Sequence, residues 1–328
     1  METTKLKNIE QNISRIGLGT WAIGGWMWGG TDEQQSIKTI RTALDKGVNL
    51  IDTAPVYGFG KSEEIVGKAL KEYGKREEVV LATKLGLDWK EGEEKPFRNS
   101  SRERIVEEID NSLHRLQTDY IDLIQVHWPD HNTPIEETAE ALDKQMKYGR
   151  VRAIGVSNYS VEQMEIFSDV TELSSNQPPY NIFERDIEKD ILPWCNANNV
   201  GILAYSSLCR GMLSGKMNKN REFKGDDLRN YDPKFQGERF EQNLNVVDEL
   251  TKMASKTYDK EIIQFAVRWV LDKGADIALW GARNPKQLDG IEGVSGWNIS
   301  EEDMQKIDDI LHKHLKDLIG PEFMAPPK

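Results

Sequence analysis

The chain has few cysteines, and they are not arranged for cross-linking or metal binding. Cys195 and Cys209 are the only two among 328 residues, and they lack CxxC spacing. A disulfide framework is therefore not expected. Both cysteines are expected to be reduced, structural thiols in a cytoplasmic protein. The five histidines and two cysteines do not gather into a Cys/His cluster, so no metal site is expected either.

An excess of positive charge and long apolar runs are also absent. The formal net charge is −12 and the pI is about 5.1, which argues against nucleic acid or an anionic membrane surface as the main partner. The longest apolar runs are strand-sized, far short of a membrane span. Residues 1–7 lack the apolar core of a signal peptide, so a cytoplasmic location is expected.

The chain does contain a regular alternation of strand-like and helix-like segments. Apolar residues at helical spacing, with capping residues and terminal glycines, predict helices over 33–46, 62–73, 101–116, 134–147 and 160–167. Strands are expected at 15–20, 48–51, 79–83, 121–126, 151–156, 175–177, 201–205 and 276–280. Eight such units without a linker predict an α/β fold in which residues 1–328 form a single (β/α)8 TIM barrel.

A doubly wound sheet is the structural alternative. Such a sheet normally carries a GxGxxG turn between its first strand and first helix. The segment Gly17-Leu18-Gly19-Thr20-Trp21 matches this pattern only in part and lacks the third glycine. The barrel is therefore favoured, with its active site at the C-terminal ends of the strands.

Four polar or aromatic residues lie where predicted strands end. Asp52, Lys84 and His127 each follow a buried strand, and Tyr57 lies in the loop after Asp52. Taken singly, each has an ordinary explanation. Asp52 would cap a turn and Lys84 would be an exposed lysine. Tyr57 would be a surface aromatic, and His127 would be a polar residue with its hydrogen bonds satisfied. At neighbouring strand ends of a barrel, however, they would share one pocket, which is hard to assign to chance.

The chemistry that this quartet suits is proton transfer to a carbonyl oxygen. A free tyrosine has a pKa of about 10, and a neighbouring ammonium such as Lys84 is expected to lower it. Asp52 would orient the lysine, and His127 would polarise the carbonyl or share the proton. Because no metal motif is apparent, a nicotinamide is the hydride source that fits.

These residues lie in motifs that resemble those of the aldo-keto reductases. The segment Asp52-Thr53-Ala54, followed by Tyr57-Gly58 and Ser62-Glu63, is similar to that family's DTAxxYGxxSE signature. Ala82-Thr83-Lys84 and residues 149–158, GRVRAIGVSN, also resemble family motifs. The resemblance covers essentially the whole chain and lies nearest to the stress-associated bacterial branch.

The resemblance implies roles at the matching positions. Tyr57 would be the general acid, tuned by Lys84 and Asp52, while His127 would orient the carbonyl. Ser157, Asn158 and Gln177 would bind the carboxamide of NADPH, and Tyr205 would stack on its ring. The other implied coenzyme residues are Trp21, Ser206, Leu208, Arg210, Gly211, Lys216, Arg229, Gly281, Arg283 and Gln287.

The loop after the eighth strand, residues 281–287, is expected to precede a helix and to bind an anion. Its backbone N–H groups suit a phosphate, and Arg283 would fork onto the 2′-phosphate of NADPH. An ordinary loop with a solvated arginine is the alternative. The chain departs from the family at Trp280, where many relatives have proline, and at Gly290-Ile291, which replace an acidic–Asn pair.

Four tryptophans fall in loops after the first, third and fourth strands: Trp26, Trp28, Trp89 and Trp128. Aromatic residues there are expected to wall an apolar substrate pocket. The alternative is that some of them only pack under long loops, and for Trp89 the two readings are balanced.

Three functions are compatible with these observations. The first is an enzyme that reduces aldehydes and ketones with NADPH, including reactive carbonyls such as methylglyoxal. Such an enzyme is expected to be a monomer or a weak homo-oligomer. The second is a nicotinamide-binding regulatory subunit with little turnover, resembling channel-associated β subunits. The third is an aldolase in which Lys84 forms a Schiff base. Tyr57 beside Lys84 and the anion loop favour the first.

Overall fold

Eight parallel strands form a closed barrel in the computed structural model, which describes residues 1–327. The strands are β3 (Ile16–Gly19), β4 (Leu50–Asp52), β5 (Val80–Leu85), β8 (Ile121–Val126), β9 (Val151–Ser157), β10 (Ser175–Gln177), β11 (Gly201–Ala204) and β12 (Ile277–Gly281). Each pairs with the next along the chain, and β12 closes the ring on β3. The predicted TIM barrel is confirmed, and the C-terminal ends of all eight strands face the same side.

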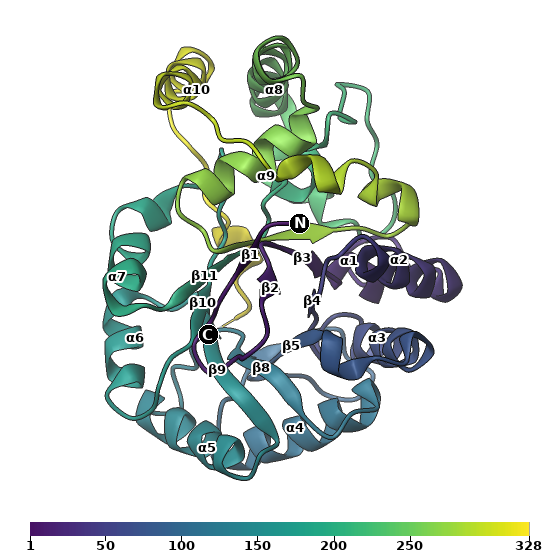
Figure 1. Cartoon of the computed structure of the whole chain (residues 1–328), viewed down its shortest axis with the longest axis vertical. Coiled ribbons are helices and arrows are strands. Elements are labelled where there is room, and N and C mark those ends of the chain that lie inside the picture. The colour runs from purple at the N-terminus through teal and green to yellow at the C-terminus, as the bar shows by residue number, and fades with distance from the viewer. Residues whose placement is uncertain (328) are drawn as a thin grey trace.

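Helices surround the barrel because each has one apolar face. They are α2 (Glu33–Asp45), α3 (Lys61–Tyr73), α4 (Arg102–Leu116), α5 (Ile135–Lys147), α6 (Val161–Ser168), α7 (Ile191–Asn198), α8 (Gly237–Tyr258), α9 (Ile262–Asp272) and α10 (Glu301–His314). In α2, for example, Ile40, Ala43 and Leu44 are buried, and the Asp32 side chain caps the first turn. Figure 1 shows this ring of helices, with α8 and α10 projecting from one side.

A short hairpin crosses the N-terminal end of the barrel. It consists of β1 (Thr3–Thr4) and β2 (Ile13–Ser14), which lie over the barrel end in Figure 1. Leu6, Ile9 and Ile13 pack against apolar side chains from the barrel interior, such as Leu50 and Leu123. This plug closes one end, so only the C-terminal end is left for a site.

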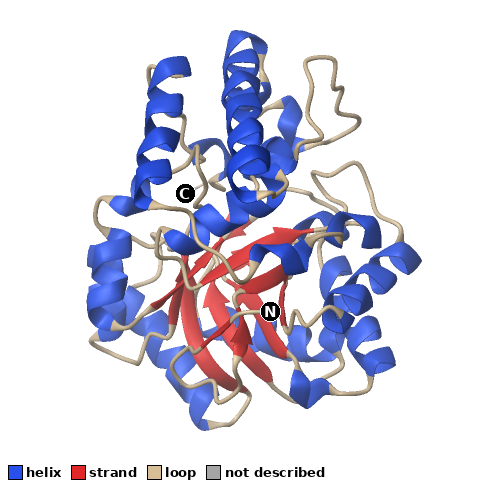
Figure 2. Ribbon diagram, turned by 45° about the horizontal axis from the view of Figure 1, so that its top comes forward, coloured by secondary structure: helices blue, strands red, loops and turns tan. Residues whose placement is uncertain are grey.

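The loops at the C-terminal end are long and carry small elements of their own. They include α1 (Trp21–Gly24) and the antiparallel pair β6 (Leu87–Asp88) and β7 (Phe97–Arg98). The remaining short helices are 3₁₀ turns. Of these, η1 (Arg76–Glu78) lies at the other end of the barrel, between α3 and β5, and η8 (Glu322–Met324) lies in the tail after α10. The others are η2 (Asp186–Glu188), η3 (Cys209–Ser214), η4 (Leu228–Asn230), η5 (Pro233–Phe235), η6 (Pro285–Leu288) and η7 (Ile291–Val294). Figure 2 separates these loops from the strands of the barrel by colour.

Several sequence-based boundaries move in the structure. Strand β4 ends at Asp52, so Asp52 is the last residue of its strand and not the residue after it. Strand β5 continues to Leu85, so Lys84 lies within the strand and not after it. The element after β12 is the single 3₁₀ turn η6 rather than an α-helix. Pro285 begins this turn, and Gly290 follows in a left-handed conformation, which interrupts a regular helix.

No helix in residues 1–327 is both long and apolar enough to cross a bilayer. Over the same residues, no group of three or more His, Cys, Asp or Glu side chains is placed to hold a metal ion.

Two glycines let the loop after β3 touch the loop that carries Tyr57. A Cβ atom on Gly24 would lie 2.4 Å from the carbonyl oxygen of Tyr57, and one on Gly58 would lie 2.2 Å from that of Gly24. Both distances are far below van der Waals contact, and both obstacles are backbone atoms. The position of Tyr57 therefore depends on the missing side chain at Gly24.

We expect Gly24→Ala to lower the free energy of unfolding by about 1–3 kcal/mol, because the new methyl group overpacks the contact with Tyr57. Urea unfolding measures this change. Gly281→Ala is the control, since its backbone is not left-handed and the nearest atom to its Cβ position is the carbonyl oxygen of Gly19 at 4.0 Å. Equal stability of Gly24→Ala and the parent would contradict the close approach.

Candidate active site

Three of the grouped side chains meet around the amino group of Lys84. Its Nζ donates to Asp52 Oδ2 at 2.7 Å and to the Tyr57 hydroxyl oxygen at 3.1 Å. A third bond reaches the carbonyl oxygen of Thr53 at 3.0 Å. Asp52 ends β4 beside β5, and Tyr57 lies in the following loop, so neighbouring strands bring the three together.

The Lys84–Asp52 ion pair is hidden from solvent, with side chains that are 1% and 2% exposed. Burial lowers the pKa of Lys84, and the negative charge of Asp52 opposes that change. An ammonium has three N–H donors, and all three are used here. The charged form is therefore directed at the oxygen of Tyr57.

The pKa of Tyr57 differs from the expectation. The neighbouring Lys84 is expected to lower it, but burial of the phenol raises the pKa of Tyr57 well above 10, and the charge of Asp52 adds to this rise. A phenolate would lose its hydration in this pocket, and the nearby carboxylate offsets the charge of Lys84. Tyr57 is thus a fully protonated donor in the protein alone.

His127 is the fourth member of the group. Its ring lies edge-on to that of Tyr57, with centroids 5.7 Å apart and an interplanar angle of 81°. Burial lowers the pKa of His127 well below 6.5, and the charge of Lys84 adds to the effect. A neutral imidazole still has one N–H to donate. His127 can therefore present a neutral donor beside the hydroxyl of Tyr57.

Gln125 also belongs to this site, although the sequence motifs do not indicate it. Its Nε2 donates to Asp52 Oδ1 at 3.2 Å, and Gln177 Nε2 donates to the same oxygen at 2.8 Å. Gln125 precedes His127 by two positions, so strand alternation turns both side chains to the same side. That alternation is the signal that would have found it.

Polar side chains from β9, β10 and β11 form a second group next to the first. Ser157 Oγ donates to the carbonyl oxygen of Gln177 at 2.7 Å. The Asn158 amide donates to the carbonyl oxygen of His127 and to Ser157 Oγ, both at 3.0 Å. The Tyr205 hydroxyl donates to Asn158 Oδ1 at 3.0 Å. All of these residues lie at the C-terminal ends of their strands.

This second group suits a flat carboxamide. The side-chain N–H groups of Asn158 and Gln177 are all bonded within the protein, so the group offers a carboxamide the Oε1 acceptor of Gln177. Tyr205 adds a flat ring next to Asn158. An amide acceptor beside a flat ring fits the nicotinamide end of NAD(P)H.

The side chain of Arg210 is buried and bound by two carboxylates. Its Nε donates to Asp232 and its Nη2 to Glu184, both at 2.6 Å, and the side chain is 1% exposed. Its Nη1 donates to Ser206 Oγ at 2.9 Å. Because its nitrogens bind buried carboxylates, Arg210 supports the loop from within.

The other residues of this loop form a tight turn with an exposed end. The N–H of Gly211 donates to the carbonyl oxygen of Leu208 at 2.9 Å, with φ of 92° at Gly211. Lys216 is exposed beyond this turn. Arg229 binds Asp227 at 2.6 Å, so its charge is already paired. Among these candidates, Lys216 has the cation most open to solvent.

Arg283 joins two loops instead of pointing into solvent. Its Nη1 and Nη2 donate to the carbonyl oxygens of Trp28 and Gly30, at 2.8 and 2.6 Å. Its backbone N–H donates to Gln287 Oε1 at 2.7 Å, and Gly281 lies exposed at the end of β12. The expected fork onto a phosphate would therefore require Arg283 to leave these two carbonyls. A cavity of about 250 Å³ lies beside it.

Trp21 stacks on Tyr57. Its ring centroid is 6.0 Å from that of Tyr57, with an interplanar angle of 24°. Trp28 packs edge-on against Trp21 at 5.5 Å. Trp21 thus supports the ring of Tyr57 directly. Trp28 packs behind Trp21, and its carbonyl oxygen accepts a hydrogen bond from Arg283.

The other three tryptophans border the same apolar cluster. Trp26 and Trp89 both contact Phe59, with ring centroids 5.0 and 5.3 Å apart. Trp26 and Trp128 also pack against the cluster that contains Tyr57. All three tryptophans are partly exposed. The structure therefore gathers these aromatic rings around the apolar cluster that contains Tyr57.

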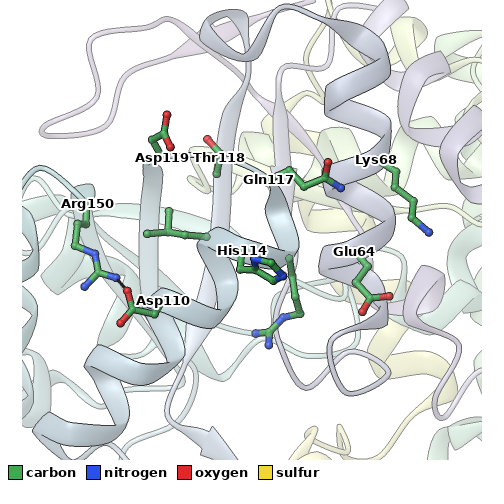
Figure 3. A pocket seen from close by; sticks show the side chains of 10 residues that line it. Glu64, Lys68, Asp110, His114, Gln117, Thr118, Asp119 and Arg150 are labelled. Atoms are coloured by element: carbon green, nitrogen blue, oxygen red, sulfur yellow. Dashed lines mark hydrogen bonds and ion pairs between the residues drawn. The ribbon is translucent and has the colours of Figure 1, made fainter.

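A larger groove, of about 850 Å³, lies outside the barrel between α3 and α4. Figure 3 shows Glu64 and Lys68 on one side of it, and Asp110, His114 and Arg150 on the other. Its lining is charged and includes none of the four grouped residues. It is therefore not the active site.

Sequence comparison agrees with the geometry. A model of the Aldo/keto reductase family matches residues 15–312. The chain is 58% identical to Aldo-keto reductase YhdN of Bacillus subtilis (strain 168), over 100% of this chain and 98% of that protein. It is 37% identical to the NADH-specific methylglyoxal reductase of Escherichia coli (strain K12), over 92% and 95%.

Solved structures give the same result. The glycerol dehydrogenase AKR11B4 from Gluconobacter oxydans has a TM-score of 0.90 and 53% identity, over 98% of this chain and 99% of that one. An aldo/keto reductase from Klebsiella pneumoniae, in complex with NADP and acetate, has a TM-score of 0.73 and 27% identity, over 94% of both chains. With its barrel, its grouped residues and these matches, the chain belongs to the aldo/keto reductase family and is an NAD(P)H-dependent carbonyl reductase.

Proposed function

We propose that the protein reduces aldehydes and ketones to alcohols with NADPH, using Tyr57 as the general acid. The observation that carries this proposal is the bond of 3.1 Å between Lys84 Nζ and the Tyr57 hydroxyl, with His127 edge-on to the same ring. A protonated phenol next to a buried ammonium is suited to give up its proton only when a negative oxygen develops nearby.

When bound, the reduced nicotinamide supplies a hydride to the carbonyl carbon. Tyr57 transfers its hydroxyl proton to the carbonyl oxygen, which becomes the alcohol. Lys84 stabilises the phenolate that remains, and Asp52 holds Lys84 in place. Neutral His127 donates a hydrogen bond to the substrate oxygen and so aligns it with Tyr57.

The proposed coenzyme preference rests on Arg283. It is partly exposed at the end of β12, next to the cavity that Asn284 and Gln287 help to line. A guanidinium and a phosphate form a bidentate pair, which is stronger than two bonds to neutral carbonyls. Arg283 would therefore exchange the carbonyls of Trp28 and Gly30 for a 2′-phosphate. The relative from Klebsiella pneumoniae binds NADP, whereas the one from Escherichia coli is NADH-specific.

The proposed substrates are small carbonyl compounds, including reactive ones such as methylglyoxal. The aromatic rings around Tyr57 offer an apolar wall, and the Escherichia coli relative is a methylglyoxal reductase. Removal of such compounds would suit a cytoplasmic protein of the stress response that acts as a monomer or weak homo-oligomer.

The aldolase alternative is disfavoured by the environment of Lys84. A Schiff base needs a free amine, but Nζ is bound by three oxygens and paired with Asp52. The complete quartet likewise argues against a regulatory subunit with little turnover.

We expect Tyr57→Phe to lower kcat for aldehyde reduction by about 10²–10⁴-fold, since the proton donor is lost. NADPH oxidation followed by absorbance measures this effect. Tyr73→Phe is the control, because its hydroxyl contacts only the surface residue Glu78. Turnover at the parent rate in Tyr57→Phe would refute the assigned role.

The pH profile of reduction should be flat near neutrality. The pKa of Tyr57 is raised well above 10 and that of His127 is lowered well below 6.5, so neither group changes its charge between pH 7 and pH 9. We expect kcat to vary less than about twofold over this range. A tenfold loss per pH unit above pH 7 would instead indicate an acid with a pKa near neutrality.

Arg283→Ala should weaken NADPH binding by about tenfold or more, because a charged hydrogen-bonding partner of the phosphate is lost. The affinity for NADH should change little. Titration of tryptophan fluorescence with each coenzyme gives both dissociation constants, and Lys75→Ala at the distant surface is the control. Parallel weakening of both coenzymes would show that Arg283 acts through its loop contacts only.

A further inference from the structure

Gln125 connects the two polar groups of the active site. It lies on β8 directly beside Lys84 in the register of the barrel, and it is completely buried. Its Nε2 donates to Asp52 Oδ1 at 3.2 Å, and its Oε1 accepts from Gln177 Nε2 at 3.0 Å. One side chain therefore touches both the ion pair that faces Tyr57 and the residue expected to bind the carboxamide.

The orientation of both glutamines is determined by Asp52. A carboxylate only accepts hydrogen bonds, so each glutamine must turn its nitrogen toward Oδ1. Gln177 Nε2 has two hydrogens, and these point to Asp52 Oδ1 and Gln125 Oε1. The plane of the Gln177 amide is thereby fixed, and its Oε1 is left as the acceptor for a ligand.

Asp52 divides its partners between its two oxygens. Oδ2 receives the charged donor from Lys84, and Oδ1 receives the two neutral donors from Gln125 and Gln177. These neutral donors disperse the charge of the carboxylate and hold its plane. A buried carboxylate with one donor fewer would carry more uncompensated charge next to Tyr57.

We propose that Gln125 is a positioning residue for carbonyl reduction, which holds Gln177 for the coenzyme and Asp52 for the acid at the same time. The proposal rests on the proposed function. Through this link, seating of the carboxamide on Gln177 and proton donation by Tyr57 depend on one side chain that touches neither coenzyme nor substrate.

Gln125→Leu removes both hydrogen bonds at nearly constant volume. We expect kcat for benzaldehyde reduction to fall about tenfold and the NADPH dissociation constant to rise about tenfold, as for one lost bond to a charged group. Gln145→Leu is the matched control, because Gln145 is also buried but bonds to Arg150 away from the site. It should leave both quantities unchanged.

Gln125→Glu separates positioning from simple packing. When protonated, the new carboxyl group has the same shape as the amide, with one donor for Asp52 and one acceptor for Gln177. When ionised, it repels Asp52. We therefore expect this variant to be impaired at pH 8.5 and to recover both kcat and NADPH affinity as the pH falls toward 5.5, whereas Gln125→Leu stays impaired at both pH values.

Equal impairment of the two variants at every pH would overturn the proposal, since only packing would then matter. Unchanged kcat and NADPH affinity in Gln125→Leu would also overturn it. The two measurements keep this test apart from the proposed reaction. If the parent protein bound NADPH but reduced no carbonyl compound, the proposed carbonyl reduction would be refuted. The NADPH dissociation constant of Gln125→Leu would still show whether Gln125 holds Gln177 for the coenzyme.

Discussion

The buried ion pair between Lys84 and Asp52 is the interaction on which the active site depends. Removing one member of such a pair leaves an uncompensated charge, at a cost of about 3–5 kcal/mol. The barrel supplies the donors that make the pair tolerable, because adjacent strands place glutamine amides and a backbone carbonyl around it. Tyr57, the proposed acid, is thus attached through Lys84 to a network that the strand ends hold rigid, although Tyr57 itself lies on the loop after β4.

Most of the fold could be predicted because short stretches of sequence determine most of its elements. Apolar runs of strand length mark strands such as β8, and glycines such as Gly47 and Gly74 mark where helices end. The parallel order of the strands then places Asp52, Lys84 and His127 at one end, whatever the loops do. The end of β5 differs from its predicted position because pairing with β8 extends the strand to Leu85. The turn η6 replaces the predicted helix, and Pro285 stands at its start.

The partners of charged side chains could not be predicted in the same way. Arg210 binds carboxylates that lie 26 and 22 positions away, and Arg283 binds carbonyls about 250 positions away. Nothing in the local sequence of either arginine indicates such a partner. The same limit applies to the pKa of Tyr57, which is governed by burial and by Asp52, and not only by the neighbouring cation.

The β1–β2 hairpin has a consequence for how ligands reach the site. The hairpin covers the N-terminal end, and apolar side chains fill the barrel interior behind it. Asp52 and Gln177 end their strands at the opposite side, and the tryptophans gather there with Tyr57. Coenzyme and carbonyl compound therefore share one route, across the C-terminal ends of the strands, and the loops that line this route govern the access of both.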